Sequence, residues 1–179
     1  RIKLQEKEFF AARDAEIATA LNKAARDRLI KALRNAEPGS TKRALFQEFE
    51  KEKRLTEANS VFVRLDGKDG GRFHFTGTGD VNTYALFAEL FANLTGGEGR
   101  AGIIVPTGVA TDATTAPFFN NLVNSHRLVS LFSFYEIRLV FPATDDRNSF
   151  CLLTVGNTDA PPRFAFSILK TGDIADERR

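Results

Sequence analysis

The sequence predicts an α/β protein in which a helical segment precedes a mixed β-sheet. Residues 5–64 carry apolar side chains at helical spacing, whereas from Gly79 onward helical stretches alternate with short apolar runs. The order helix, strand, helix, strand, strand is typical of one end of a doubly wound sheet. The last two strands follow each other too closely for a helical crossover, so one of them should run antiparallel. We therefore expect a helical segment over residues 1–65 and an α/β portion over residues 66–179.

The helical segment carries two recognisable helix starts. Asp14 is placed to cap a short helix, and Ser40 or Thr41 is placed to cap a longer one over residues 42–59. Residues 61–65 fit either a short strand or the end of that longer helix.

The α/β portion should contain three strands and a possible fourth, over residues 101–105, 128–135, 149–155 and 164–169. Residues 72–75 alternate like a further short strand. Asp80 should cap a helix over residues 81–94, and Thr111 or Asp112 should cap the next one. The apolar face of the helix over residues 81–94 is expected to consist of Tyr84, Phe87, Ala88 and Phe91.

The composition is that of a packed domain without a membrane span. Of the 179 residues, 42% are hydrophobic and 27% are charged. No apolar run approaches the roughly 20 residues that a span needs, and residues 1–7 lack the apolar region of a signal peptide. The single cysteine, Cys151, cannot form an internal disulfide, which favours a reduced, cytoplasmic setting. Because the chain begins at Arg1 and contains no methionine, we expect it to be part of a longer protein.

Several classes of site are disfavoured by the residues themselves. The net charge of +2 is too small to argue for nucleic acid by itself. His74 and His126 lie far apart without Cys or acidic partners at ligand spacing, so no metal site is expected. Cys151 falls inside an apolar strand and should be an inert buried thiol. No Ser–His–Asp group or pair of catalytic carboxylates can be placed.

Four blocks of the chain carry a resemblance to a known family. They are residues 1–10 (RIKLQEKEFF), 80–87 (DVNTYALF), 99–112 (GRAGIIVPTGVATD), and 141–142 together with 148–154 (FP and NSFCLLT). In this order, they are similar to the large adenine-specific DNA methylases of type IIG restriction–modification and of BREX-like and DISARM-like phage-defence systems.

The resemblance implies the C-terminal half of a class I S-adenosylmethionine-dependent methyltransferase domain. The strands here would be the fifth, sixth and seventh of a mostly parallel sheet, with the reversed seventh between the other two. The family's catalytic Asn-Pro-Pro-aromatic loop would precede Arg1, so no catalytic residue falls in this chain, which alone should be inactive. The partners implied are double-stranded DNA with a flipped adenine and the upstream half of the same domain. S-adenosylmethionine would be the cofactor of the full-length protein, with none bound to this chain.

The resemblance also places residues that meet the target base. Phe141 stands where the family has the ring that stacks on the flipped base, and Pro142 would stiffen that loop. Because the chain has 17 phenylalanines, a place in the core is the other interpretation of Phe141. Arg147 and Ser149 are matched to a phosphate near the base, with a solvent-facing side chain as the alternative for Arg147. Where the family often has a His-Arg-Ser run, residues 146–149 read Asp-Arg-Asn-Ser, and the added acid weakens attraction for a phosphate.

Three further residues are expected to line the cleft or contact DNA. Thr107 and Gly108 follow the carboxyl end of a strand, the edge at which open α/β sheets bind ligands, although an ordinary turn has the same sequence pattern. Tyr84 lies near the start of the preceding helix and would otherwise pack in the core.

Residues 73–79 imitate a strand that leads into a cofactor-binding glycine loop, Gly77-Thr78-Gly79. A nucleotide loop of this type needs an acid at the end of the following strand to bind the ribose, but that strand ends Val105-Pro106-Thr107. We therefore interpret the glycines as turn residues. The principal alternative for the whole chain is a non-catalytic α/β module that binds DNA or a protein.

Overall fold

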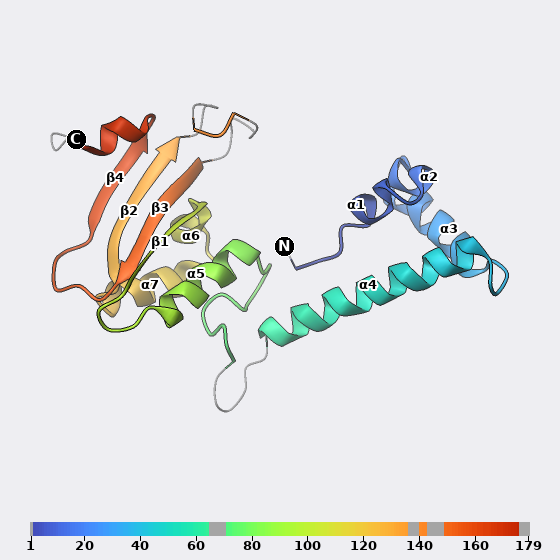
Figure 1. The fold of residues 1–179 in the computed structure, drawn as a ribbon, viewed down its shortest axis with the longest axis horizontal. Coiled ribbons are helices and arrows are strands. Elements are labelled where there is room, and N and C mark those ends of the chain that lie inside the picture. The colour runs from blue at the N-terminus through green and yellow to red at the C-terminus, as the bar shows by residue number, and fades with distance from the viewer. Residues whose placement is uncertain (1, 65–70, 136–139, 143–148, 176–179) are drawn as a thin grey trace. The chain divides into compact units, whose positions relative to one another are not determined.

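A computed structural model describes residues 2–64, 71–135, 140–142 and 149–175 (Figure 1). The chain divides into two compact units, Ile2–Val63 and Arg64–Arg179, which are described separately. The first unit is helical, and the second is α/β with a four-stranded mixed sheet.

The helical unit contains α1 (Glu6–Ala11), α2 (Ala15–Ala18), α3 (Lys23–Arg34) and α4 (Thr41–Arg64). Side-chain caps set three of the helix starts. Asp14 accepts a hydrogen bond from the Ile17 amide at 3.1 Å, Asn22 from the Ala25 amide at 2.9 Å, and Ser40 from the Arg43 amide at 3.2 Å. The caps expected at Asp14 and Ser40 are thus confirmed. Residues 61–64 continue α4, so the helix interpretation of that stretch is correct.

Three phenylalanines form the centre of the helical unit. The rings of Phe9, Phe10 and Phe49 meet with centroids 4.9 to 5.5 Å apart, and Ile17 and Leu33 complete the buried cluster. Aromatic pairs of this kind stabilise a small core beyond their buried area. Only one residue of α3 is buried, so most of that helix faces solvent.

The α/β unit contains α5 (Thr83–Leu94), β1 (Arg100–Pro106), α6 (Gly108–Thr111), α7 (Ala116–Asn124), β2 (Leu128–Tyr135), β3 (Ser149–Gly156), β4 (Arg163–Ile168) and the 3₁₀ turn η1 (Thr171–Ala175). The strand order is β1-β3-β2-β4. β3 runs antiparallel to both β1 and β2, and β4 runs parallel to β2. The expected antiparallel pair is confirmed, and the third strand lies between the first two.

The helices of this unit cover one face of the sheet (Figure 1). Val105, Leu131 and Leu153 face a core closed by residues of α5, α6 and α7, among them Phe118 and Leu122. Alternate residues of a strand point to opposite faces. The second face therefore carries a row of cross-strand partners, Ile104, Leu152 and Phe132. Ile104 is 59% exposed, so this row is an apolar surface that the described helices of the unit leave open.

The structure corrects three local expectations. Residues 72–75 form bends and turns instead of a strand. α5 begins at Thr83 without a side-chain cap, so Asp80 does not cap it. Of its expected apolar face, Ala88 is buried and Tyr84 packs against the core. Phe87 and Phe91 are exposed and stack on each other, because small alanines fill the contact with the sheet. The buried residues of α5 are Ala85, Leu86, Ala88, Glu89 and Ala92.

Candidate functional site

The antiparallel register brings together the end of β1 and the start of β3. The Thr107 amide donates to the Ser149 carbonyl oxygen at 3.3 Å, and the Thr107 hydroxyl lies 3.5 Å from the same oxygen. Pro106 pairs with Phe150 across the sheet. Thr107 and Ser149, 42 residues apart in sequence, therefore lie together at one end of the strands. This is the end at which open α/β sheets bind ligands, because the carboxyl end of β1 lies there.

A tightly packed turn follows this edge. The Tyr84 hydroxyl donates to Asp112 Oδ2 at 3.3 Å, directly over Gly108. A β-carbon at Gly108 would lie 2.5 Å from Asp112 Oδ2 and 2.9 Å from the Tyr84 oxygen, so a larger residue here would displace these two side chains. The buried Thr115 hydroxyl donates to the Gly108 carbonyl at 2.6 Å and holds the turn from below. Tyr84 and Gly108 are thus neighbours, with Asp112 between them.

Asp112 was expected as a possible cap of the helix that follows, and this expectation is wrong. α7 begins at Ala116 with Thr115 at its N-cap position, and the Asp112 side chain accepts from Tyr84 instead. Burial, followed by the charge and hydrogen bond of Asp112, raises the pKa of Tyr84. The single phenolic proton of Tyr84 is donated to Asp112, so this pair joins α5 to the turn around Gly108.

Three aromatic rings lie in a row at the same end of the sheet, on its second face. Phe134 and Phe150 are cross-strand partners whose rings stack at 4.9 Å with an angle of 5°. Phe141 meets Phe150 edge-on at 5.1 Å. Phe134 is buried, whereas Phe141 is 37% exposed. Phe141 is thus connected through Phe150 to a stacked pair of rings, and neither Phe134 nor Phe150 was identified from the sequence because only the strand register pairs them.

The sequence-predicted residues thus fall into connected groups. Thr107 joins Ser149 on one side of the turn, and Tyr84 joins Gly108 on the helix-covered side. Phe141 reaches the same edge through Phe150 on the opposite face. Arg147 lies outside the described residues.

A buried carboxylate fixes the turn that contains Gly77-Thr78-Gly79. Glu89 of α5 is 1% exposed and accepts three hydrogen bonds: from the Phe75 amide at 3.3 Å, the Thr76 amide at 2.9 Å and the Thr76 hydroxyl at 2.6 Å. Gly79 has a positive φ of 65°. With a turn in place of the strand before the glycines, the arrangement differs from a nucleotide-binding strand–loop–helix unit. The one signal for Glu89 in the sequence was an acid within the otherwise apolar helix.

Cys151 should resist alkylation in the folded chain. It is completely buried, and burial raises the pKa of its thiol from 9.0 to about 11. At pH 8 this pKa lowers the reactive thiolate fraction by about 100-fold, and burial blocks access in addition. We expect labelling by iodoacetamide at pH 8 to be at least about 100-fold slower in buffer than in 8 M urea. Because this is the only cysteine, mass spectrometry measures it directly, and equal rates in the two conditions would contradict the buried position.

The described ranges contain no group of three or more His, Cys, Asp or Glu residues arranged to hold a metal ion. Within the same ranges, no helix combines the length and the apolar character required to traverse a bilayer.

The described residues around Thr107 and Phe141 offer three kinds of group for contact with a ligand. They are the Thr107 hydroxyl, the Tyr84 phenol with its acceptor Asp112, and the partly exposed ring of Phe141. Comparison of this chain with protein-family models, curated proteins and solved structures found no match.

Proposed function

We propose that this chain supplies the target-base side of the active cleft of an N6-adenine DNA methyltransferase. In this proposal, S-adenosylmethionine and the catalytic loop are held by residues outside the present sequence. The DNA partner is a duplex from which one adenine has been extruded. The proposal rests on the family resemblance and on the arrangement at one end of the sheet.

The exposed ring of Phe141 is the observation that carries the proposal. An extruded base needs a flat apolar surface, and stacking on an aromatic ring stabilises it by about 1–3 kcal/mol. Phe150, which is itself stacked on Phe134, contacts the Phe141 ring edge-on, and this contact would help to hold the ring in position for a base. Thr107 lies where β1 ends, and its hydroxyl is 3.5 Å from the Ser149 carbonyl oxygen at the start of β3.

The open borders of the sheet also support the proposal. Among the described strands, β1 pairs with β3 alone and stands at one side of the sheet. Its Ile104 is exposed, and the row from Ile104 to Phe132 is apolar. The unpaired side of β1 is an edge of the kind that natural proteins usually cover or pair with another strand. The upstream half of a methyltransferase domain would extend the sheet from β1.

The decisive experiment uses the polypeptide that contains this chain and measures transfer of tritiated methyl groups to DNA. We expect Phe141→Ala to lower kcat/KM by about 5- to 150-fold, the range that corresponds to the loss of one stacked base. Phe141→Trp should restore most of the activity because it keeps a flat ring.

Phe166→Ala is the matched control. Phe166 is a 67% exposed phenylalanine of β4, within the same unit, and should leave methyl transfer unchanged. If Phe141→Ala is as active as Phe166→Ala, Phe141 does not hold the base. If the whole polypeptide transfers no methyl groups to any DNA, the non-catalytic binding module becomes the better explanation.

A further inference from the structure

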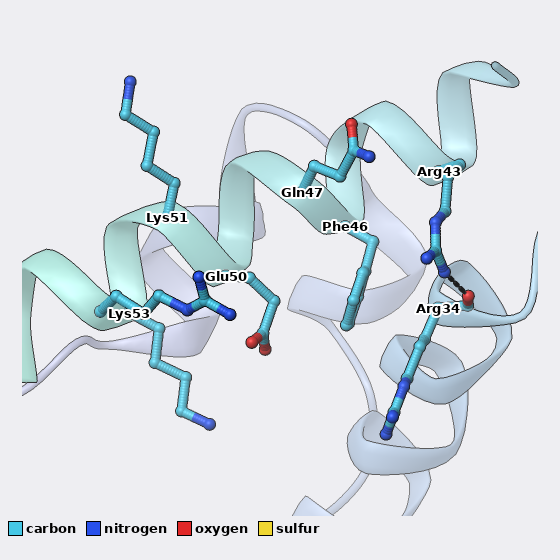
Figure 2. A pocket seen from close by; sticks show the side chains of 8 residues that line it. Arg34, Arg43, Phe46, Gln47, Glu50, Lys51 and Lys53 are labelled. Atoms are coloured by element: carbon cyan, nitrogen blue, oxygen red, sulfur yellow. Dashed lines mark hydrogen bonds between the residues drawn. The ribbon is translucent and has the colours of Figure 1, made fainter. Parts of the chain in front are cut away.

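The helical unit carries a basic hollow that the proposed function does not use. It has a volume of about 740 Å³ and lies along α4, with one wall from the end of α3 (Figure 2). Five cations line it: Arg34, Arg43, Lys51, Lys53 and Arg54. Glu50 is the only acid among the lining residues, so the hollow has a local net charge of +4.

The charge of the whole chain conceals this concentration. Residues 2–63 contain 13 Lys and Arg against 10 Asp and Glu, a net charge of +3, whereas the chain as a whole carries +2. The positive excess therefore lies on the helical unit. A basic surface concentrated along one helix is the usual electrostatic footprint of nucleic-acid binding.

The cations in the hollow are available to a ligand. The ion pairs found among the described residues of this unit, Arg13 with Glu48 and Arg26 with Glu6, lie outside the hollow. Arg43 is the most constrained of the five, since it donates to the Arg34 carbonyl and its guanidinium lies 5.6 Å from the centre of the Phe46 ring. Figure 2 shows Lys51 and Lys53 extending from α4 in opposite directions, with Glu50 on the same side of the helix as Lys53.

The distance over which the cations of the hollow are spread along α4 indicates a polymeric ligand. From Arg43 to Arg54 the helix rises about 16 Å. Side chains spread over this distance cannot all contact one small anion. Successive phosphates of a DNA strand advance about 3.4 Å along the duplex axis, so the length from Arg43 to Arg54 corresponds to about five of them.

We infer that this hollow binds the phosphate backbone of duplex DNA without regard to sequence. The inference rests on the proposed function for the choice of DNA, and it assigns to the helical unit a second contact apart from the target-base site. Such contacts fix position and orientation on the duplex, while base contacts specify the sequence.

The test is fluorescence anisotropy of the full 179-residue chain with a fully paired, labelled 20-base-pair duplex, titrated at several NaCl concentrations. Lys51, Lys53 and Arg54 are exposed, and their combined change to Gln keeps good helix-forming residues in α4. We expect this triple variant to weaken binding at least tenfold in 0.1 M salt. The slope of log K against log salt should become shallower by about 2 to 3, roughly one per lost phosphate contact.

A matched variant removes the same charge elsewhere on the helical unit. Lys7, Lys23 and Arg28 are exposed, lie outside the hollow and change to Gln with the same loss of three charges. This control should change the salt slope by less than about 1. A single change in the opposite direction, Glu50→Gln, should tighten binding. Circular dichroism of each variant checks that the helices remain.

Four outcomes would overturn the inference. They are no binding of the duplex by the unaltered chain, equal weakening by the two triple variants, tighter binding of a single-stranded RNA of the same length, and displacement by inorganic phosphate at an ionic strength where chloride does not displace. The test is independent of methyl transfer and of Phe141. A negative result in the DNA-binding test therefore leaves the proposed role of Phe141 untouched, and a negative result in the methyl-transfer test leaves the proposed DNA contact of the hollow untouched.

Discussion

Glu89→Ala is expected to lower the free energy of unfolding of the α/β unit by about 3–5 kcal/mol. The carboxylate is buried and accepts three hydrogen bonds from Phe75 and Thr76. Its removal leaves two backbone amides and a hydroxyl unsatisfied, and each such buried group costs about 1–3 kcal/mol. Alanine is the best helix former, so a change in helix propensity of α5 cannot explain a loss.

Urea unfolding followed by tyrosine near-ultraviolet circular dichroism measures this effect in the correct unit. The chain has no tryptophan and two tyrosines, Tyr84 and Tyr135, both in the α/β unit. Glu98→Ala removes an exposed acid just beyond α5 and should change stability by less than about 0.5 kcal/mol. Glu89→Gln should fall between them, because an amide offers one acceptor oxygen in place of two. A Glu89→Ala loss below about 1 kcal/mol would show that the carboxylate does not hold the turn.

The sequence was sufficient to predict those features that depend on local patterns. The apolar runs around Ile103, Leu131 and Leu153 were recognised as strands, because continuous apolar stretches bounded by turn residues have few other structures. Capping by Asp14 and Ser40 was predictable because each cap involves residues only three positions apart.

Features that depend on distant partners were missed or misread. Asp112 is of a residue type that commonly caps helices, but its hydrogen-bond partner Tyr84 lies 28 residues away. Residues 72–75 alternate like a strand, yet the end of this stretch is held by Glu89, on a helix that follows. The stack of Phe134 on Phe150 depends on the register of two strands. Local periodicity contains none of this information, which becomes available only when the chain has folded.

The exposure of the apolar row Ile104, Leu152 and Phe132 follows from the topology of the sheet, and local sequence patterns did not predict it. β3 is apolar on both faces, as expected for a strand covered on both sides, but the described helices of its unit cover one. Leu153 and Leu152 are consecutive and chemically identical, and they point to opposite faces. Replacing each of them by alanine therefore measures how much each face of the sheet contributes to the free energy of unfolding.

Leu153→Ala should lower the free energy of unfolding by about 2–5 kcal/mol, because the side chain is completely buried beneath α5 and α7 and its loss leaves a cavity. Leu152→Ala should cost about 1 kcal/mol or less in this chain, since the residue is only partly buried. The same near-ultraviolet signal measures both variants. Equal losses would mean that the second face is already closed, and the sheet would then need no further layer. In the longer polypeptide that the proposed function requires, the loss for Leu152→Ala should rise toward that of Leu153→Ala, because the added layer of the domain would bury the row from Ile104 to Phe132.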